Sequence, residues 1–140
     1  MAFWDASAIV PLCCSQSGTA RSRRLHRELE RMVVWWGTPI EARSAFARLV
    51  REKLLTAGQR AMAVRLLAQL RVAWDGILPT ERVGTLAEEL LDEYGVRAAD
   101  AVQLAAALVW CRERPRQRPF VCFDERLGSA AGAPGFSVRA

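Results

Sequence analysis

The sequence predicts an α/β fold: a single domain in which a central, mainly parallel sheet of four or five strands is flanked by helices. The chain has 140 residues, of which 51% are hydrophobic, so residues 1–140 are expected to form one domain around one core. Its short apolar segments do not alternate apolar with polar residues, as strands of a sheet with one face in water do. Helical stretches separate these segments, and this order favours parallel pairing of the strands.

The first half of the chain has clear helix signals. Leu25 and Leu29 are spaced i,i+4 among arginines, as in an amphipathic helix. Thr38, Pro39 and Glu41 occupy the N-cap, N1 and N3 positions of a capping box. In chain order, the expected elements are a strand over 2–4, helices over 6–14 and 17–31, a strand over 32–36, and helices over 38–56 and 59–74.

The second half alternates in the same way. Thr80 is expected to cap a helix that Gly95 closes, and Pro115 to end the most apolar helix of the chain. In the first half of the chain, Ala57 and Gly58 are expected to mark the end of the helix over 38–56. The expected elements are a short strand over 76–78, helices over 81–94 and 98–114, a strand over 120–123, a short helix over 124–131 and a last strand over 136–139.

Charge and composition exclude several classes of protein. The net charge is +5 and Lys53 is the only lysine, so the surface is rich in guanidinium groups, which suit phosphate-bearing partners. No apolar run approaches the roughly 18 residues that cross a bilayer. The N-terminus has no basic region, and Asp5 interrupts its apolar stretch, so we expect no secretory signal and a cytoplasmic location. The four cysteines form no Cys-x-x-Cys pair, which favours reduced thiols.

Acidic residues stand where strands end and helices begin. Asp5 and Asp124 each follow an apolar strand, whereas Glu41 and Asp100 each lie in the first turn of a helix. In a parallel sheet these positions share one edge, so we expect the four carboxylates to converge. Carboxylates brought together repel unless a cation gathers them, and oxygen ligands favour Mg²⁺ or Mn²⁺. Taken singly, each acid also has a structural explanation, because acids cap exposed helix amides.

Four segments carry a resemblance to a known family. They resemble, in the right order, the four motifs of PIN domains, and specifically of VapC-type toxins: residues 3–8 (FWDASA), 38–45 (TPIEARSA), 98–107 (AADAVQLAAA) and 120–127 (FVCFDERL). The resemblance spans residues 3–127, and the third and fourth segments together are highly specific. It implies a PIN-like fold.

The resemblance also implies an activity and partners. The chain is expected to be a Mg²⁺- or Mn²⁺-dependent endoribonuclease that cuts an RNA such as tRNA or rRNA to stop growth. A cognate VapB-type antitoxin would silence it, and relatives suggest a homodimer. Carried over by position, the metal-binding catalytic acids are Asp5, Glu41, Asp100 and Asp124, with the Ser7 hydroxyl nearby.

Two features depart from the family pattern. Cys122 stands where many relatives have Thr or Ser, which puts a polar contact there in question. Trp35 and Trp36 are bulkier than the residues expected before the second motif, and would point to opposite faces of their strand. At least one of them is expected in the core, while Trp36 is a candidate contact for an RNA base or for the antitoxin.

Other residues leave alternatives open. His26 is the only histidine and lies among arginines, which indicates an exposed helical residue and excludes catalysis by a histidine pair. Arg116 and Arg118 are candidate RNA or antitoxin contacts, and equally fit a solvated surface. Two further functions remain: a non-catalytic α/β binding or adaptor module whose acids only cap helices, and a DNA-directed PIN-type nuclease. A phosphoacceptor receiver is disfavoured because Lys53 lies inside a predicted helix.

Overall fold

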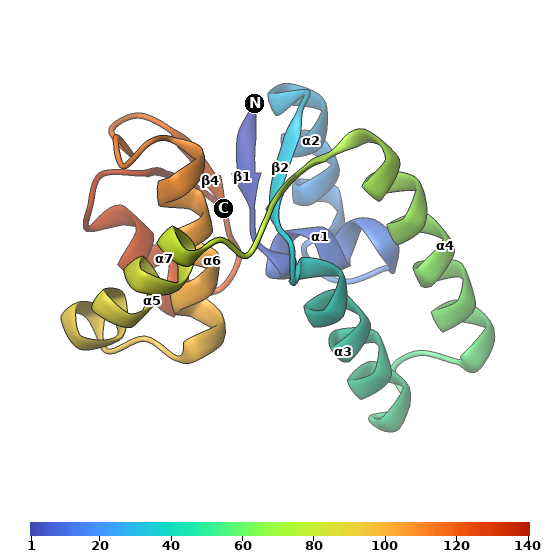
Figure 1. Ribbon diagram of the computed structural model, residues 1–140. Coiled ribbons are helices and arrows are strands. Elements are labelled where there is room, and N and C mark those ends of the chain that lie inside the picture. Colours follow the sequence, from blue (N-terminus) through green and yellow to red (C-terminus); the bar gives the residue numbers. More distant parts are fainter.

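Five short strands pair in parallel to form one sheet in the computed structural model, which describes residues 1–140 (Figure 1). The strands are β1 (Ala2–Trp4), β2 (Met32–Trp35), β3 (Asp75–Ile77), β4 (Pro119–Val121) and β5 (Ser137–Arg139). Their order across the sheet is β3-β2-β1-β4-β5, and every neighbouring pair is parallel. The predicted parallel sheet of four or five strands is therefore confirmed.

The strand order contains one point at which the chain reverses its direction across the sheet. From β1 the chain moves outward to β2 and β3, then returns past β1 to β4 and continues to β5. The chain therefore leaves β1 in one direction across the sheet and leaves β4 in the other, although these two strands are hydrogen-bonded neighbours. In sheets of this kind, ligands bind in the crevice beyond the carboxyl ends of the strands at such a switch point.

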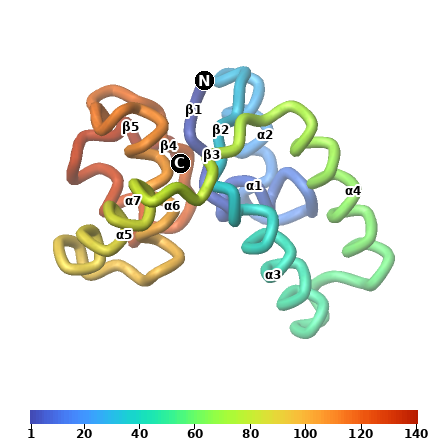
Figure 2. The backbone as a smooth tube through the Cα atoms, in the orientation of Figure 1, coloured from blue at the N-terminus to red at the C-terminus, as the bar shows by residue number.

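Helices cover both faces of the sheet. One layer is α1 (Ala6–Cys13), α2 (Thr19–Leu29), α3 (Thr38–Arg51) and α4 (Ala57–Ala73), and the other is α5 (Glu81–Tyr94), α6 (Ala98–Trp110) and α7 (Glu125–Gly132). The tube in Figure 2 shows these layers to the right and to the left of the central strands. Alternate strand residues enter the two cores, Trp4 on the α1–α4 side and Phe3 on the α5–α7 side. Because both faces are buried, the strands show no polar alternation.

The start of α3 differs from the predicted capping box. Its N-cap is Gly37, which makes no side-chain cap. A side chain at position 37 would collide with the Trp35 indole, because a Cβ there would lie 2.5 Å from Nε1. Thr38 is fully buried, and its hydroxyl accepts a hydrogen bond from the Gln103 amide instead of capping the helix. Glu41 is thereby released from the predicted capping role.

The boundary between α3 and α4 also differs from the prediction. The helix α3 ends at Arg51 rather than near residue 56, and the Ala57–Gly58 pair opens α4 instead of ending its predecessor. Thr56 caps α4: its hydroxyl accepts from the Gln59 N–H, and the Gln59 side chain accepts from the Thr56 N–H. Thr56 and Gln59 stand three residues apart, as a capping box requires, so the sequence already contained the signal that starts α4 here.

The helix predicted before β4 extends further along the chain than the helix in the structure. The helix α6 ends at Trp110 rather than at residue 114, because Arg112 and Glu113 adopt positive φ angles of 54° and 58°. The strand β4 ends at Val121 rather than at residue 123. Cys122 and the residue after it therefore lie beyond the sheet, beside the carboxyl ends of the strands. The other predicted elements agree within one or two residues at each end.

The aromatic residues near the sheet have distinct environments. Trp35 is buried and Trp36 is 53% exposed, so the predicted division of the pair between core and surface is confirmed. His26 is less exposed than predicted, because its ring packs against Trp4 with 6.0 Å between the centroids. None of the helices combines the length and the apolar composition needed to cross a bilayer.

The core beneath α3 provides a test of how this helix is held. Phe46 is fully buried on α3, in the same cluster as Ile9 of α1. We expect Phe46→Ala to lower the free energy of unfolding by about 3–5 kcal/mol, because the cavity it leaves is not refilled. Urea unfolding followed by circular dichroism measures this loss. Ile40→Ala, on the same helix but 63% exposed, serves as control and should change stability by less than about 0.5 kcal/mol. Similar effects of the two variants would contradict this packing.

Candidate active site

Two of the predicted acids stand at the switch point of the sheet. Asp5 follows β1 and is the N-cap of α1, where Oδ2 accepts from the Ser7 N–H at 2.9 Å. Asp124 follows β4 as the N-cap of α7, and its Oδ1 accepts from the Leu127 N–H at 2.8 Å. Capping thus occupies one oxygen of each carboxylate. The other oxygen of each carboxylate is left for a ligand, so helix capping and ligand binding are compatible.

The other two acids come from helices on opposite sides of this edge. Glu41 lies in the first turn of α3, and its Oε2 accepts from Gln103 Nε2 at 3.2 Å. Asp100 lies in the first turn of α6 and is half-buried. Because α3 and α6 belong to different helical layers, these acids reach the strand edge from its two sides.

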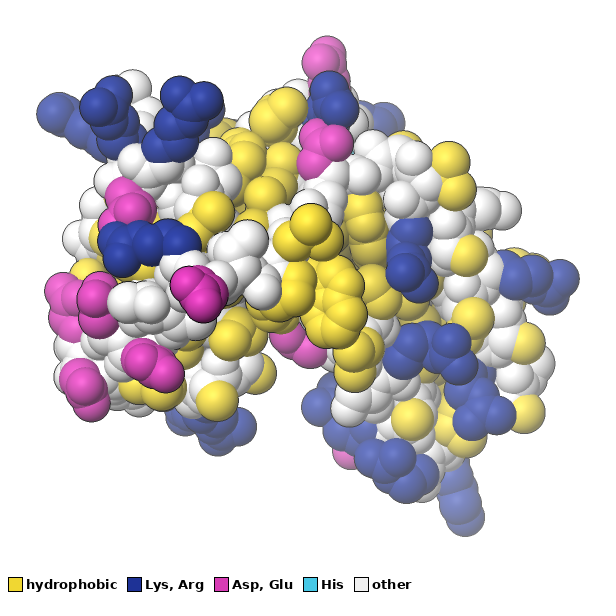
Figure 3. All heavy atoms as spheres, in the orientation of Figure 1, with side chains coloured by type: hydrophobic (Ala, Val, Ile, Leu, Met, Phe, Trp, Pro, Cys, Tyr) yellow, Lys and Arg dark blue, Asp and Glu magenta, His cyan; other side chains and the backbone are white.

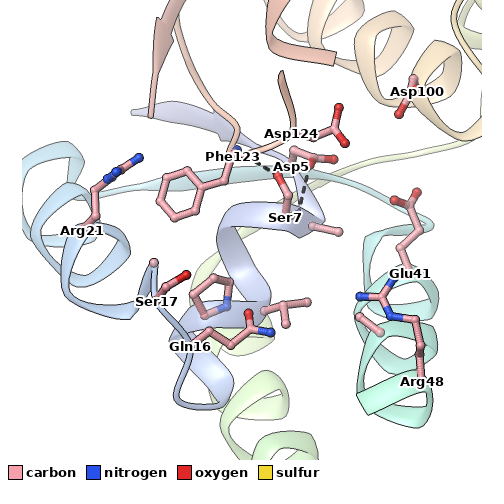
Figure 4. A pocket seen from close by; sticks show the side chains of 15 residues that line it. Asp5, Ser7, Gln16, Ser17, Arg21, Glu41, Arg48, Asp100, Phe123 and Asp124 are labelled. Atoms are coloured by element: carbon pink, nitrogen blue, oxygen red, sulfur yellow. Dashed lines mark hydrogen bonds between the residues drawn. The ribbon is translucent and has the colours of Figure 1, made fainter. Parts of the chain in front are cut away.

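All four acids line one cavity of about 670 Å³. Figure 4 shows the carboxyl groups of Asp5, Glu41, Asp100 and Asp124 pointing toward a common space, each from a different element. The wall on the α1–α2 side contains Ser7, Gln16, Ser17, Gly18 and Arg21, and Arg48 lies on α3. The predicted convergence of the acids at one edge is thus observed in the structure.

The carboxyl groups of Asp5, Glu41 and Asp100 hold protons more tightly than free side chains do. Burial raises the pKa of Asp5, and the nearby charge of Asp124 adds to the increase. Burial raises the pKa of Glu41 to about 7, with smaller contributions from the charges of Asp5 and Asp100. The pKa of Asp100 is raised by burial and by the charge of Asp124. Each shift reflects the cost of placing negative charges together where water is partly excluded.

The donor set fits a hydrated hard cation. No three Asp, Glu, His or Cys side chains are grouped tightly enough to enclose an ion unaided. Mg²⁺ usually keeps several of its waters and is held by only one or two carboxylates, so it does not require an enclosing group of three protein ligands. The oxygen-only chemistry of the four acids disfavours zinc. Burial raises the pKa of the Cys122 thiol to about 12, so the thiol is protonated at neutral pH in the metal-free chain.

Comparison with solved structures shows the same fold in proteins of distant sequence. A chain of a toxin–antitoxin complex from Klebsiella pneumoniae superposes with a TM-score of 0.69 at 17% identity, covering 100% of this chain and 98% of that one. A chain of FitAcB from Neisseria gonorrhoeae gives a TM-score of 0.66 at 16% identity, covering 100% and 97%. No family model matches the sequence, and no curated protein matches it. These two likenesses show the fold alone, and they confirm the predicted α/β class with a parallel sheet flanked by helices.

Ser7 links the two central strands beyond their carboxyl ends. Its N–H donates to Asp5, and its hydroxyl accepts from the Phe123 N–H at 2.9 Å. The Cys122 sulfur lies 3.8 Å from both the Ser7 hydroxyl and Asp5 Oδ2, and 3.2 Å from the Asp124 carbonyl oxygen. Cys122 therefore occupies the position of the expected Thr or Ser as a weakly polar group, while Ser7 makes the strong contacts.

Gln103 is a site residue to which sequence reasoning assigned no role. It lies one turn after Asp100 on α6, is 1% exposed, and donates to both Thr38 and Glu41. Its Oε1 is buried without a hydrogen-bond partner. The spacing i,i+3 from Asp100 placed Gln103 on the same face of the helix, and a glutamine on the most apolar helix was the available signal.

The arginines that line the cavities around the acids are not the ones that the sequence suggested as RNA or antitoxin contacts. Arg21 and Arg48 line the acid cavity, and Arg97 and Arg126 line a second cavity that adjoins it at Asp100, Phe123 and Asp124. Arg116 and Arg118 precede β4, at the opposite edge of the sheet from the acids. Trp36, the candidate RNA or antitoxin contact, is absent from the lining of the acid cavity, as is Trp35. Figure 3 shows Lys and Arg side chains, drawn in one colour, gathered on separate parts of the surface.

The raised pKa of Glu41 makes the stability of the metal-free protein depend on pH. The pKa is about 7 in the folded chain against a reference of 4.5, so the native state holds the extra proton between these values. The resulting stabilisation is complete below pH 4.5 and is lost as the pH rises to 7. We expect this loss to reach about 3 kcal/mol at most, and Glu41→Gln to reduce it.

Urea unfolding in EDTA at several pH values measures this dependence. Glu88→Gln, which removes an exposed acid of α5, is the matched control and should retain the slope of the parent. An unchanged slope in Glu41→Gln would show that the Glu41 carboxyl is not the buried acid described here.

Proposed function

We propose that this chain is a divalent-metal-dependent endoribonuclease, the toxin of a VapBC-type toxin–antitoxin pair. The observation that carries the proposal is the convergence of four carboxylates, from four different elements, on one cavity at the switch point of a parallel sheet. Pure helix capping explains Asp5 and Asp124 but not Glu41, which caps nothing and is half-buried among other acids. Holding such a group together costs stability, which a bound cation offsets.

The fold supports the same proposal. Two of its structural neighbours come from a toxin–antitoxin complex and from FitAcB, and each matches over the whole of this chain. Within the proposal, the partners are an RNA substrate such as tRNA or rRNA and a VapB-type antitoxin, the chain forms a homodimer, and it acts in the cytoplasm.

Mg²⁺ or Mn²⁺ would be held by Asp5, Glu41, Asp100 and Asp124, with water completing its coordination. The ion would lower the pKa of an attacking water and shield the charge that develops on the phosphodiester. Gln103 orients Glu41 by donating to Oε2, which leaves Oε1 free toward the cavity. Ser7 keeps Asp5 in position through its N–H.

Cations of the chain would attract the substrate to this acidic centre. Arg21 makes no ion pair, and Arg48 has only a long contact of 3.9 Å with Glu52, so both guanidinium groups are available to phosphates. Arg97 and Arg126 would do the same in the adjoining cavity. Binding that depends on these contacts should weaken as salt concentration rises.

Cleavage of total cellular RNA by the purified protein tests the proposal. We expect discrete fragments in Mg²⁺ or Mn²⁺, none in EDTA, and no cutting of a single-stranded DNA of matched sequence. Asp100→Asn should lower the rate by about 100-fold or more, because it removes a charged ligand. Asp92→Asn, an exposed acid on α5, is the matched control and should cut at the rate of the parent.

The outcomes separate the competing functions. If Asp100→Asn unfolds at the same urea concentration as the parent or higher, its loss of cutting is chemical rather than structural. Cutting of DNA alone would favour a DNA-directed nuclease. Absence of cutting in either metal, with the protein folded, would overturn the nuclease proposal in favour of a non-catalytic binding module.

A further inference from the structure

Phe123 is the only aromatic side chain in the lining of either cavity at the acidic edge. It follows β4, directly before Asp124, and is half-buried. The acid cavity and the adjoining one share it together with Asp100 and Asp124. An apolar ring thus faces a largely polar groove at the point where the carboxylates converge, although part of its surface packs against the core on the α1–α4 side.

The position of the ring is tied to the carboxylates. The Phe123 N–H donates to the Ser7 hydroxyl, and the Ser7 N–H donates to Asp5. On the other side, the ring lies so close to Gly18 that a Cβ there would be 3.0 Å from Cε2. The absence of a side chain at position 18 therefore lets the ring settle against the start of α2. A platform held at both its backbone and its edge has little freedom to lose when a ligand stacks on it.

The polar groups around the ring have no ion pair and no side-chain hydrogen bond within the chain. The Arg21 guanidinium lies over the Phe123 ring, with its carbon 5.5 Å from the ring centroid, and no carboxylate pairs with it. Figure 4 shows Arg21 beside the ring of Phe123, with Ser17 and Gln16 below it on the same wall. The side chains of Ser17 and Gln16 line the cavity and make no hydrogen bond within the chain. Aromatic face, cation and unpaired polar groups are therefore adjacent.

We propose that Phe123 and Arg21 form a binding subsite for one unpaired nucleotide, with its base stacked on the Phe123 ring and its phosphate paired with the Arg21 guanidinium. The inference deepens the proposed function, on which it rests for the identity of the substrate. Base stacking on an aromatic ring needs an exposed base face, which a paired and stacked duplex does not offer. The subsite therefore selects single-stranded RNA at the acidic edge, and Ser17 and Gln16 are placed to contact the edge of the base.

Binding of two oligonucleotides in EDTA tests the subsite without cleavage. One probe is a fluorescein-labelled RNA of ten adenosines, and the other carries the same number of phosphates on abasic sugars. By fluorescence anisotropy, the full-length parent should bind the adenosine probe about tenfold more tightly, the size of one base–aromatic stack. Phe123→Leu, which keeps an apolar side chain against Gly18, should lose most of this preference, whereas Phe123→Tyr should retain it.

The arginine has a matched control on its own helix. Arg21→Ala should weaken binding of both probes alike and reduce the slope of affinity against salt by about one ion. Arg23→Ala removes the same charge from α2, but Arg23 lines a different cavity. It should change both affinities by less than about twofold. Equal effects of the two variants would show that Arg21 acts only through net charge.

The test separates the subsite from the nuclease. Equal affinity of the parent for both probes, or a base preference that survives in Phe123→Leu, would overturn the subsite even if total RNA is cleaved. A base preference that disappears in Phe123→Leu would support the subsite, and it would do so even if no RNA is cut and the nuclease proposal fails.

Discussion

Parallel pairing of β1 with both β2 and β4 is the constraint on which the rest of the structure depends. Parallel pairing directs the carboxyl ends of these strands to one edge of the sheet. The return of the chain from β3 to β4 makes a switch point between β1 and β4, and a crevice opens beyond their carboxyl ends. Residues that follow the central strands therefore meet residues that begin the flanking helices. Asp5, Glu41, Asp100 and Asp124 are brought together by this topology, although up to 119 positions of sequence separate them.

The convergence has an electrostatic cost that the local structure reduces. Asp5 and Asp124 accept hydrogen bonds from helix amides, and for Asp5 these bonds favour the charged form. Glu41 receives one from Gln103. These bonds do not cancel burial and mutual repulsion, because the pKa of Glu41 still rises to about 7. Stability is thus given up at this site, and within the proposed function a bound cation would restore it.

The site is mechanically coupled to the groove beside it. Ser7 connects the ends of β1 and β4 by bonding Asp5 and Phe123 at once. Any group stacked on Phe123 is therefore held at a fixed position relative to the first acid. Gln103 plays a comparable part on the other side, where it joins the start of α3 to α6. Buried hydrogen bonds of this kind hold their partners in one arrangement.

The sequence by itself determined the alternation of strands and helices, the parallel sheet and the four acids at its edge, because buried strands and helix starts leave local signals. Only the tertiary structure decided what surrounds the acids. Thr38 is buried against Gln103 rather than capping its helix, since the Trp35 indole leaves room only for Gly37 before it. Likewise, which arginines line the groove depends on which helix faces meet there. Such contacts join residues distant in sequence, and no local pattern of residue types records them.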